Sequence, residues 1–269
     1  MPWIWAALMP HPPVMIAQVG QGRERAAALT LEGVRKLQDS LRKPPGGGAP
    51  KGLMILSPHQ PYVRGGLYLN SADVLSGDLR RFGAPQIAFR LERHQAWESV
   101  YSHLRSAGLD TGVAPAPDLG PDHGSLVPLH FLAQVFDIPE VVIANPVGMS
   151  LKEAWQLGKA LAGFGHDEPW ALLASGDLSH RLTQEAPAGY DPEGRLFDHD
   201  LVAALEDGTV DNLLTAWPSE RLSRAGECGC RSALALLGLA GGPVEVFSYE
   251  GPFGVGYANA LWVNDCYAR

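Results

Sequence analysis

Short apolar segments that alternate with amphipathic helical patterns are the feature that most limits how this chain can fold. The apolar segments have the length of strands buried on both faces, at 3–8, 53–56, 140–144, 170–174, 244–249 and 257–263. Helical spacing of apolar residues fills the intervals, at 21–42, 95–107, 126–136, 151–161, 195–206 and 231–239. Strands separated by helices indicate the α/β class. We expect residues 1–269 to form a single three-layer domain, with a central, mixed and mostly buried sheet flanked by helices.

Size and charge exclude several classes of protein. A chain of 269 residues with 46% hydrophobic residues can bury a full core without disulfides and is too apolar to be disordered. Its net charge of −8 argues against a nucleic-acid binder, which needs clustered Lys and Arg to follow phosphates. We therefore expect no nucleic-acid partner.

The cysteines and the N-terminal residues bear on the cellular compartment. Cys228, Cys230 and Cys266 are odd in number and lack a framework spacing, which is typical of reduced thiols in a cytoplasmic protein. The apolar N-terminal residues carry no basic region and are interrupted by prolines, so neither a signal peptide nor a membrane span is expected. We expect a cytoplasmic protein with no membrane partner, and we leave a homo-oligomer open.

Histidines follow several of the predicted strands. His11 follows the first apolar segment, His59 follows the second, and His180 follows the segment at 170–174. Ligands of open α/β sheets bind beyond the carboxyl ends of the strands, where residues distant in sequence meet. A single histidine after a strand is usually a loop residue, but prolines flank both His11 and His59 and stiffen their loops. This pair of histidines therefore indicates a metal site.

The segment Gly226-Glu227-Cys228-Gly229-Cys230, before an apolar helix, admits three interpretations. Its cysteines could bind a metal, although a structural zinc site needs a second paired cluster. Glu227 could complete a set of two histidines and one carboxylate, which leaves open positions on Fe(II). Alternatively, Glu227 could be an acidic residue favoured by the dipole at a helix N-terminus.

His123 is a further candidate for function. It lies in Asp122-His123-Gly124-Ser125, directly after a loop rich in glycine and proline. Loops of this kind often carry active-site residues.

These motifs, together with residues at the end of the chain, occur in the order of a known family and span nearly the whole sequence. They are Pro10-His11-Pro12-Pro13, Ser57-Pro58-His59, Asp122-His123-Gly124, Ser175-Gly176-Asp177-Leu178-Ser179-His180, Glu227 and the tail at 249–257. In them the chain resembles the class III extradiol ring-cleavage dioxygenases, the superfamily of the protocatechuate 4,5-dioxygenase catalytic (beta-type) subunit. The Memo-like proteins are non-dioxygenase relatives in that superfamily.

The resemblance implies an oxidoreductase of aromatic-compound catabolism that uses non-haem Fe(II). It implies that His11, His59 and Glu227 hold the iron, and that a catechol-like or aminophenol-like aromatic and O₂ are the substrates. It also implies that His180 is the catalytic acid and base, and that His123 hydrogen-bonds the substrate or the oxygen.

At one position the chain departs from the dioxygenase pattern, and this departure keeps other functions open. Memo-like relatives carry a cysteine where the dioxygenases carry the carboxylate, and here Glu227 and Cys228 are adjacent. A thiolate ligand favours zinc or copper. The alternatives to an Fe(II) dioxygenase are a Memo-like metal-binding or accessory protein and a zinc-dependent hydrolase.

Overall fold

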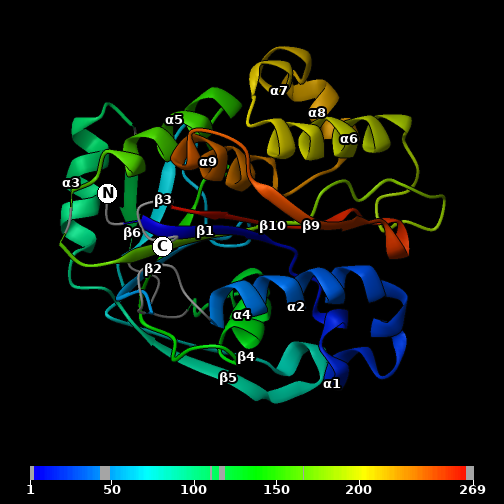
Figure 1. The fold of residues 1–269 in the computed structure, drawn as a ribbon, viewed down its shortest axis with the longest axis horizontal. Helices are drawn as coiled ribbons and strands as arrows, with labels where there is room; N and C mark the ends of the chain where they lie inside the picture. Colours follow the sequence, from blue (N-terminus) through cyan, green and yellow to red (C-terminus); the bar gives the residue numbers. More distant parts are fainter. Residues whose placement is uncertain (1–2, 43–48, 110, 115–118, 166, 265–269) are drawn as a thin grey trace.

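A single mixed sheet of eight strands runs through the computed structural model, which describes residues 3–42, 49–109, 111–114, 119–165 and 167–264. The strand order is β6-β3-β7-β2-β8-β1-β10-β9, and Figure 1 shows helices above and below the sheet. This confirms the α/β class with a central mixed sheet flanked by helices. Cys266 lies outside the described residues.

Every predicted strand is present, with ends that differ by at most one residue from the expected ones. The strands of the sheet are β1 (Trp3–Met9), β2 (Gly52–Leu56), β3 (Leu67–Asn70), β6 (Thr111–Ala114), β7 (Glu140–Asn145), β8 (Trp170–Ser175), β9 (Glu245–Glu250) and β10 (Tyr257–Val263). Strands β7, β2, β8 and β1 are parallel neighbours, whereas β10 runs antiparallel to β1 and β9. The carboxyl ends of β1, β2 and β8 therefore lie together at one edge.

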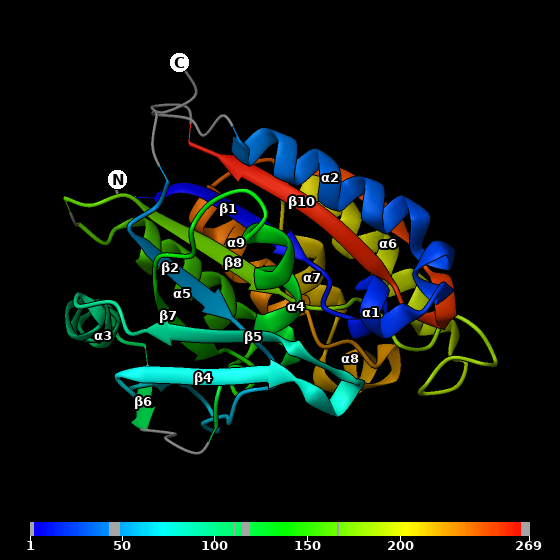
Figure 2. The ribbon, with the colours of Figure 1, turned by 90° about the horizontal axis from the view of Figure 1, so that it is seen from below.

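Helices cover both faces of the sheet. One face packs against α3 (Trp97–Ser106), α5 (Leu151–Ala162), α6 (Pro192–Asp207), α7 (Asp211–Ala216), α8 (Ser219–Ala225) and α9 (Cys230–Ala240). The other face packs against α1 (Ala17–Gly20), α2 (Ala28–Arg42), α4 (His123–Leu132) and a separate hairpin of β4 (Val74–Leu79) and β5 (Ala84–Glu92). Figure 2 shows α2 lying along β10, and Figure 1 shows α2 and the β4–β5 hairpin both below the sheet. Short 3-10 turns complete the fold, at Pro13–Met15, Arg23–Ala27, Arg80–Phe82 and Pro252–Gly254.

The central strands are buried on both faces. Along β1, Ala6 and Leu8 join the core beneath α5 and α9, whereas Ala7 and Met9 join the core against α2 and α4. Alternating side chains of a strand point to opposite faces, so a strand between two layers must be apolar throughout. This explains why these strands appear in the sequence as unbroken apolar runs.

Three local expectations differ from the structure. The helix expected at 21–42 is divided into a 3-10 turn at Arg23–Ala27 and α2, which begins at Ala28. The residues at 62–70 have the pattern of a hairpin, and Val63 and Gly66 do form an isolated antiparallel bridge, but β3 itself pairs with β6 and β7. The helix expected at 126–136 begins earlier, at His123, because the Asp122 side chain caps it by accepting the N–H of Ser125. Pro128 consequently lies inside this helix rather than in its first turn.

None of the helices in the described part of the chain is sufficiently long and apolar to cross a membrane.

Candidate metal centre

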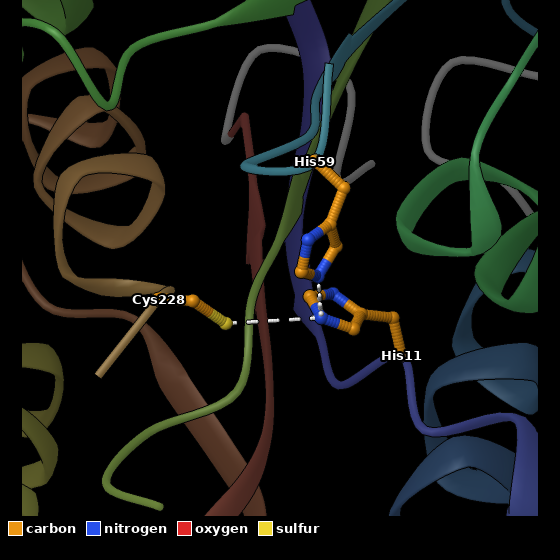
Figure 3. Close-up of side chains that lie close together, drawn as sticks. All are labelled: His11, His59 and Cys228. Carbon is orange, nitrogen blue, oxygen red and sulfur yellow. Dashed lines mark hydrogen bonds between the residues drawn. The ribbon is translucent and has the colours of Figure 1, made fainter. Parts of the chain in front are cut away.

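Two imidazoles and one thiol converge at the carboxyl ends of the central strands. His11 follows β1 and His59 follows β2, while Cys228 approaches from the loop before α9 (Figure 3). The two Nε2 atoms are 3.0 Å apart, and the Cys228 sulfur lies 3.7 Å from Nε2 of His11. All three donor atoms lie within 4.8 Å of one another. Within the described ranges, no other His, Cys, Asp or Glu side chains come together in such a group.

The distances from Nε2 of His11 to the other two donor atoms fit a single metal ion. Metal–nitrogen bonds of about 2.1 Å and metal–sulfur bonds of about 2.3 Å place ligand atoms about 3–4 Å from each other. His11 is buried, Cys228 is partly buried and His59 is exposed, so the site is open on the side of His59. The residues present therefore fit a metal ion with two nitrogen ligands and one sulfur ligand.

Hydrogen bonds fix the protonation of the His11 ring. The Ser175 hydroxyl donates to the backbone carbonyl of Gly124, so its oxygen accepts from Nδ1–H of His11, 2.8 Å away. This leaves a lone pair on Nε2, which is the atom that faces His59 and Cys228. The backbone N–H of His11 donates to the Asp177 carboxylate at 3.0 Å. Partners of this kind orient a ligand histidine and increase its basicity.

A network around Asp122 holds the loop of His59 against the start of α4. The Asp122 carboxylate accepts from the Ser57 hydroxyl at 2.7 Å and from the Gln60 side chain at 2.6 Å, in addition to capping α4. Gly124 permits this approach, because a Cβ atom there would lie 2.5 Å from the Ser57 oxygen.

Desolvation favours the neutral form of the clustered histidines, which is the form that binds metals. Desolvation lowers the pKa of His11 well below 6.5, and the neighbouring imidazoles lower it further. Desolvation also lowers the pKa of His59 and His180, and it lowers the pKa of His123 to about 4. The ring of His123 stacks on that of His59, with centroids 4.2 Å apart. The structure therefore brings His123 beside the predicted ligands.

His180 also reaches this centre. Its Nδ1 lies 2.8 Å from the backbone carbonyl of Gly226 and therefore carries the proton, which leaves Nε2 free to accept one. That Nε2 is 3.8 Å from the Asp177 carboxylate, and Nε2 of His11 lies 3.8 Å from the same oxygen. Burial raises the pKa of Asp177 to about 7.

Glu227, the expected third ligand, occupies a different position. Its carboxylate accepts from the backbone N–H of Cys230 at 2.6 Å, at the start of α9, and pairs with Arg231 at 3.4 Å. This is the helix-terminus role that the sequence left open, and the helix dipole favours it. Cys228 faces the imidazoles instead. Burial raises the pKa of its thiol, so binding of a metal ion would have to displace the proton.

Two glycines allow the Cys228 loop to cross the loop after β8. The N–H of Gly229 donates to the Asp177 carbonyl at 2.9 Å, and the N–H of Asp177 lies 3.3 Å from the Cys228 sulfur. A Cβ atom on Gly176 would lie 2.1 Å from Cα of Gly229. A Cβ atom on Gly229 would lie 2.8 Å from the Asp177 carbonyl oxygen.

Replacing Gly229 by alanine is therefore expected to move the Cys228 sulfur away from the imidazoles. We expect metal affinity to fall about 10–100-fold, the range known for residues that support metal ligands. Titration with Co(II) against a competing chelator measures this. Gly165→Ala is the matched control, since a Cβ atom there meets nothing within 4 Å. Unchanged affinity in Gly229→Ala would show that this crossing does not position the thiol.

A buried carboxyl supports the loop that carries His180. Asp198, in α6, accepts the N–H of Ser179 at 2.8 Å and the Tyr249 hydroxyl at 2.7 Å. Burial raises the pKa of Asp198 from 3.8 to about 7. Folding thus favours the protonated acid, so this group lowers the unfolding free energy as pH rises from about 4 to about 7.

Asp198→Asn removes that titration. Relative to the parent protein, the variant is expected to gain stability as pH rises through this window, by at most a few kcal/mol, since one pKa unit corresponds to about 1.4 kcal/mol. Denaturant unfolding at pH 4.5 and pH 8 checks this, with the exposed Asp207→Asn as the control. A stability difference that is the same at both values contradicts the assignment.

A pocket of about 490 Å³ adjoins the centre on the side of His59. Apolar side chains of the β4–β5 hairpin and of α4 line it beside the imidazoles of His59 and His123, among them Leu79, Phe82 and Leu126. This volume is in the range of small-molecule sites. The pocket could not be predicted from the sequence, because the apolar residues of the β4–β5 hairpin form no regular strand pattern.

Comparisons with known proteins agree with the fold and the motifs. The sequence profile of the "catalytic LigB subunit of aromatic ring-opening dioxygenase" matches residues 5–259. "Protein CA_C1420" of Clostridium acetobutylicum is 32% identical over 263 residues, which cover 93% of this chain and 55% of that protein. The chain thus spans about half the length of this curated relative.

A solved structure shares the fold. The crystal structure of uncharacterized protein JW3007 from Escherichia coli K12 superposes with a TM-score of 0.65 at 18% identity, and covers 96% of this chain and 99% of that one. The profile match extends over nearly the whole chain and includes every motif of the centre. The chain belongs to the family of the catalytic LigB subunit of aromatic ring-opening dioxygenases.

Proposed function

We propose that this chain is a Memo-like, metal-binding member of the family, in which His11, His59 and Cys228 hold one Zn(II) or Cu(I) ion. The observation that carries the proposal is the position of the Cys228 sulfur, 3.7 Å from Nε2 of His11, while the Glu227 carboxylate accepts the N–H of Cys230. It supports the cysteine pattern of the Memo-like relatives over the carboxylate pattern of the dioxygenases.

The donor set bears on the choice of metal. Two imidazoles and a thiolate favour zinc or copper over Fe(II), which is typically held by two histidines and a carboxylate when it activates oxygen. A bound ion of this kind supplies Lewis acidity to a ligand in the adjacent pocket. His11, His59 and Cys228 would hold and orient the ion. The pocket beside His59 and His123 has room for the ligand.

Metal analysis tests this proposal. Protein stripped with a chelator and reloaded with Zn(II), Cu(I) or Fe(II) is expected to bind one ion per chain, with Zn(II) or Cu(I) held more tightly than Fe(II). Binding of less than about 0.1 ion per chain, or tightest binding of Fe(II) without involvement of Cys228, would overturn the proposal.

Extradiol ring cleavage is the second candidate, and the surroundings of the centre favour it. His180 presents an unprotonated Nε2 and can accept the proton of a substrate hydroxyl as a general base. His123 lies beside His59 at the pocket, where it can hydrogen-bond a catechol or aminophenol. His180 and His123 would then be catalytic, with Fe(II) as the metal and O₂ as the co-substrate.

Oxygen uptake distinguishes the two functions. Protein loaded with Fe(II) under anaerobic conditions is mixed with catechols and aminophenols, and O₂ consumption and yellow ring-opened products are recorded. The Memo-like proposal expects no consumption above that of free iron. Rapid consumption that His180→Ala eliminates, while iron is retained, would establish the dioxygenase instead. The zinc hydrolase depended on Glu227 as a ligand, and the contacts of its carboxylate do not favour that function.

A further inference from the structure

We propose that Pro128 is a positioning residue for the metal centre, because its missing N–H frees a carbonyl that fixes the tautomer of His11. This inference rests on the proposed metal site. Its first observation is a proline within α4, surrounded by buried residues and away from either end of the helix.

A proline inside a helix leaves one carbonyl without its partner. The N–H of residue 128 would bond to the carbonyl of residue 124, four positions earlier, but proline has no N–H. Gly124 and Pro128 are both buried, so water does not readily replace that bond. An unpaired buried carbonyl is costly, and native structures rarely retain one.

The Ser175 hydroxyl supplies the missing partner. Ser175 ends β8, is fully buried, and donates to the Gly124 carbonyl at 2.5 Å. A serine hydroxyl has a single proton, so once it is donated to Gly124 its oxygen can only accept toward other groups. The neighbour that it faces is Nδ1 of His11, at 2.8 Å.

The tautomer of His11 follows from this chain of bonds. Because the Ser175 oxygen must accept, Nδ1 of His11 carries the ring proton and Nε2 presents its lone pair to the metal position. The sequence separation is large, since α4, β8 and the loop after β1 each supply one member. Pro128 thus acts on His11 through Gly124 and Ser175, without touching the centre itself.

A competing donor at position 128 would weaken this arrangement. In Pro128→Ala, the new N–H can bond to the Gly124 carbonyl, and the Ser175 hydroxyl becomes free to turn its proton toward Nδ1 of His11. That rotation favours the Nε2-protonated form of His11, which cannot bind a metal through Nε2. The same new bond completes the helix, so the variant is expected to resist unfolding at least as well as the parent protein.

The test combines two variants with two measurements. We expect Zn(II) affinity to fall about 10–100-fold in Ser175→Ala, the range for partners of ligand histidines. In Pro128→Ala we expect a smaller fall, of about 3–10-fold, because the Ser175 hydroxyl is still present. In the double variant, Pro128→Ala is expected to add nothing, because both changes act on one path. Nitrogen NMR of the metal-free protein is expected to show His11 protonated at Nδ1 in the parent and at a mixture of positions in Pro128→Ala.

Controls separate this role from simple packing. Pro192→Ala removes a proline at the first turn of α6, where no intrahelical bond is missing, and is expected to change neither measurement. If Pro128→Ala does not fold, Pro128→Val supplies the same N–H and fills more of the space. Unchanged affinity and an unchanged tautomer in a folded position-128 variant would overturn the proposal, as would additive losses in the double variant. The tautomer is read without metal, so failure of the parent protein to bind Zn(II) would refute the metal site separately.

Discussion

His11→Ala is expected to abolish retention of a metal ion. His11 is 2% exposed and its ring contacts both other candidate ligands, so its removal leaves His59 and Cys228 without a common neighbour. Changes to groups that only support a ligand already cost 10–100-fold in affinity, and we therefore expect a loss greater than about 100-fold. Competition between the protein and a chelator for Zn(II) measures it.

The control for this variant is His199→Ala, whose side chain is 81% exposed in α6. It removes an imidazole without touching the centre and is expected to retain the parent affinity. If His11→Ala binds Zn(II) as tightly as His199→Ala does, the ion lies elsewhere and the proposed site is wrong.

The second large effect on metal affinity is expected at Cys228 and not at its neighbour Glu227. Cys228→Ser keeps the size of the side chain but removes the sulfur, and we expect Zn(II) affinity to fall by about 100-fold, as loss of a ligand should exceed loss of its support. Glu227→Gln keeps an oxygen that can accept the N–H of Cys230, and we expect metal affinity to stay within about threefold, since its carboxylate does not face the ion.

The free energy of unfolding is expected to change more in Glu227→Gln than in Cys228→Ser, which is the reverse of the effects on metal affinity. Glu227→Gln weakens the charge interaction at the start of α9 and is expected to cost about 1 kcal/mol of unfolding free energy. Cys228→Ser is expected to have little effect on the stability of metal-free protein. A large loss of affinity in Glu227→Gln, with Cys228→Ser unaffected, would restore the carboxylate as the third ligand.

The sequence predicted the part of the site that depends on strand ends. An apolar run buried on both faces must end where the chain leaves the core, so the residues after β1, β2 and β8 could be assigned to one edge. His11, His59, His123 and His180 do meet there in the structure. The capping box at Ser150 and Glu153 was also predictable, because both of its bonds are local.

The third side chain of the cluster could not be predicted, because Glu227 and Cys228 are neighbours in the sequence. Which of them faces the histidines depends on two features of the backbone. Gly226 ends α8 in the left-handed conformation, with φ of 65°, and Gly229 packs closely against Gly176. Neither is visible in residue types alone. The N-terminus of α9 then provides bonds that hold the carboxylate of Glu227.

The β4–β5 hairpin and the early start of α4 were missed for different reasons. The hairpin packs only one side against the core, so its apolar residues are few and spaced irregularly. In α4, the rule that places proline in the first turn suggested a later start, whereas Ser175 compensates for Pro128 from a strand distant in the sequence. Helix propensity depends on neighbouring residues and gives no information about a partner that is distant in the sequence.

X-ray absorption at the metal edge of protein loaded with Zn(II) tests the central claim most directly. We expect one sulfur neighbour at about 2.3 Å and nitrogen neighbours at about 2.0–2.1 Å, with the sulfur signal absent from Cys228→Ser and retained in Glu227→Gln. A spectrum of the parent protein with only nitrogen and oxygen neighbours, or a sulfur signal that persists in Cys228→Ser, would contradict it.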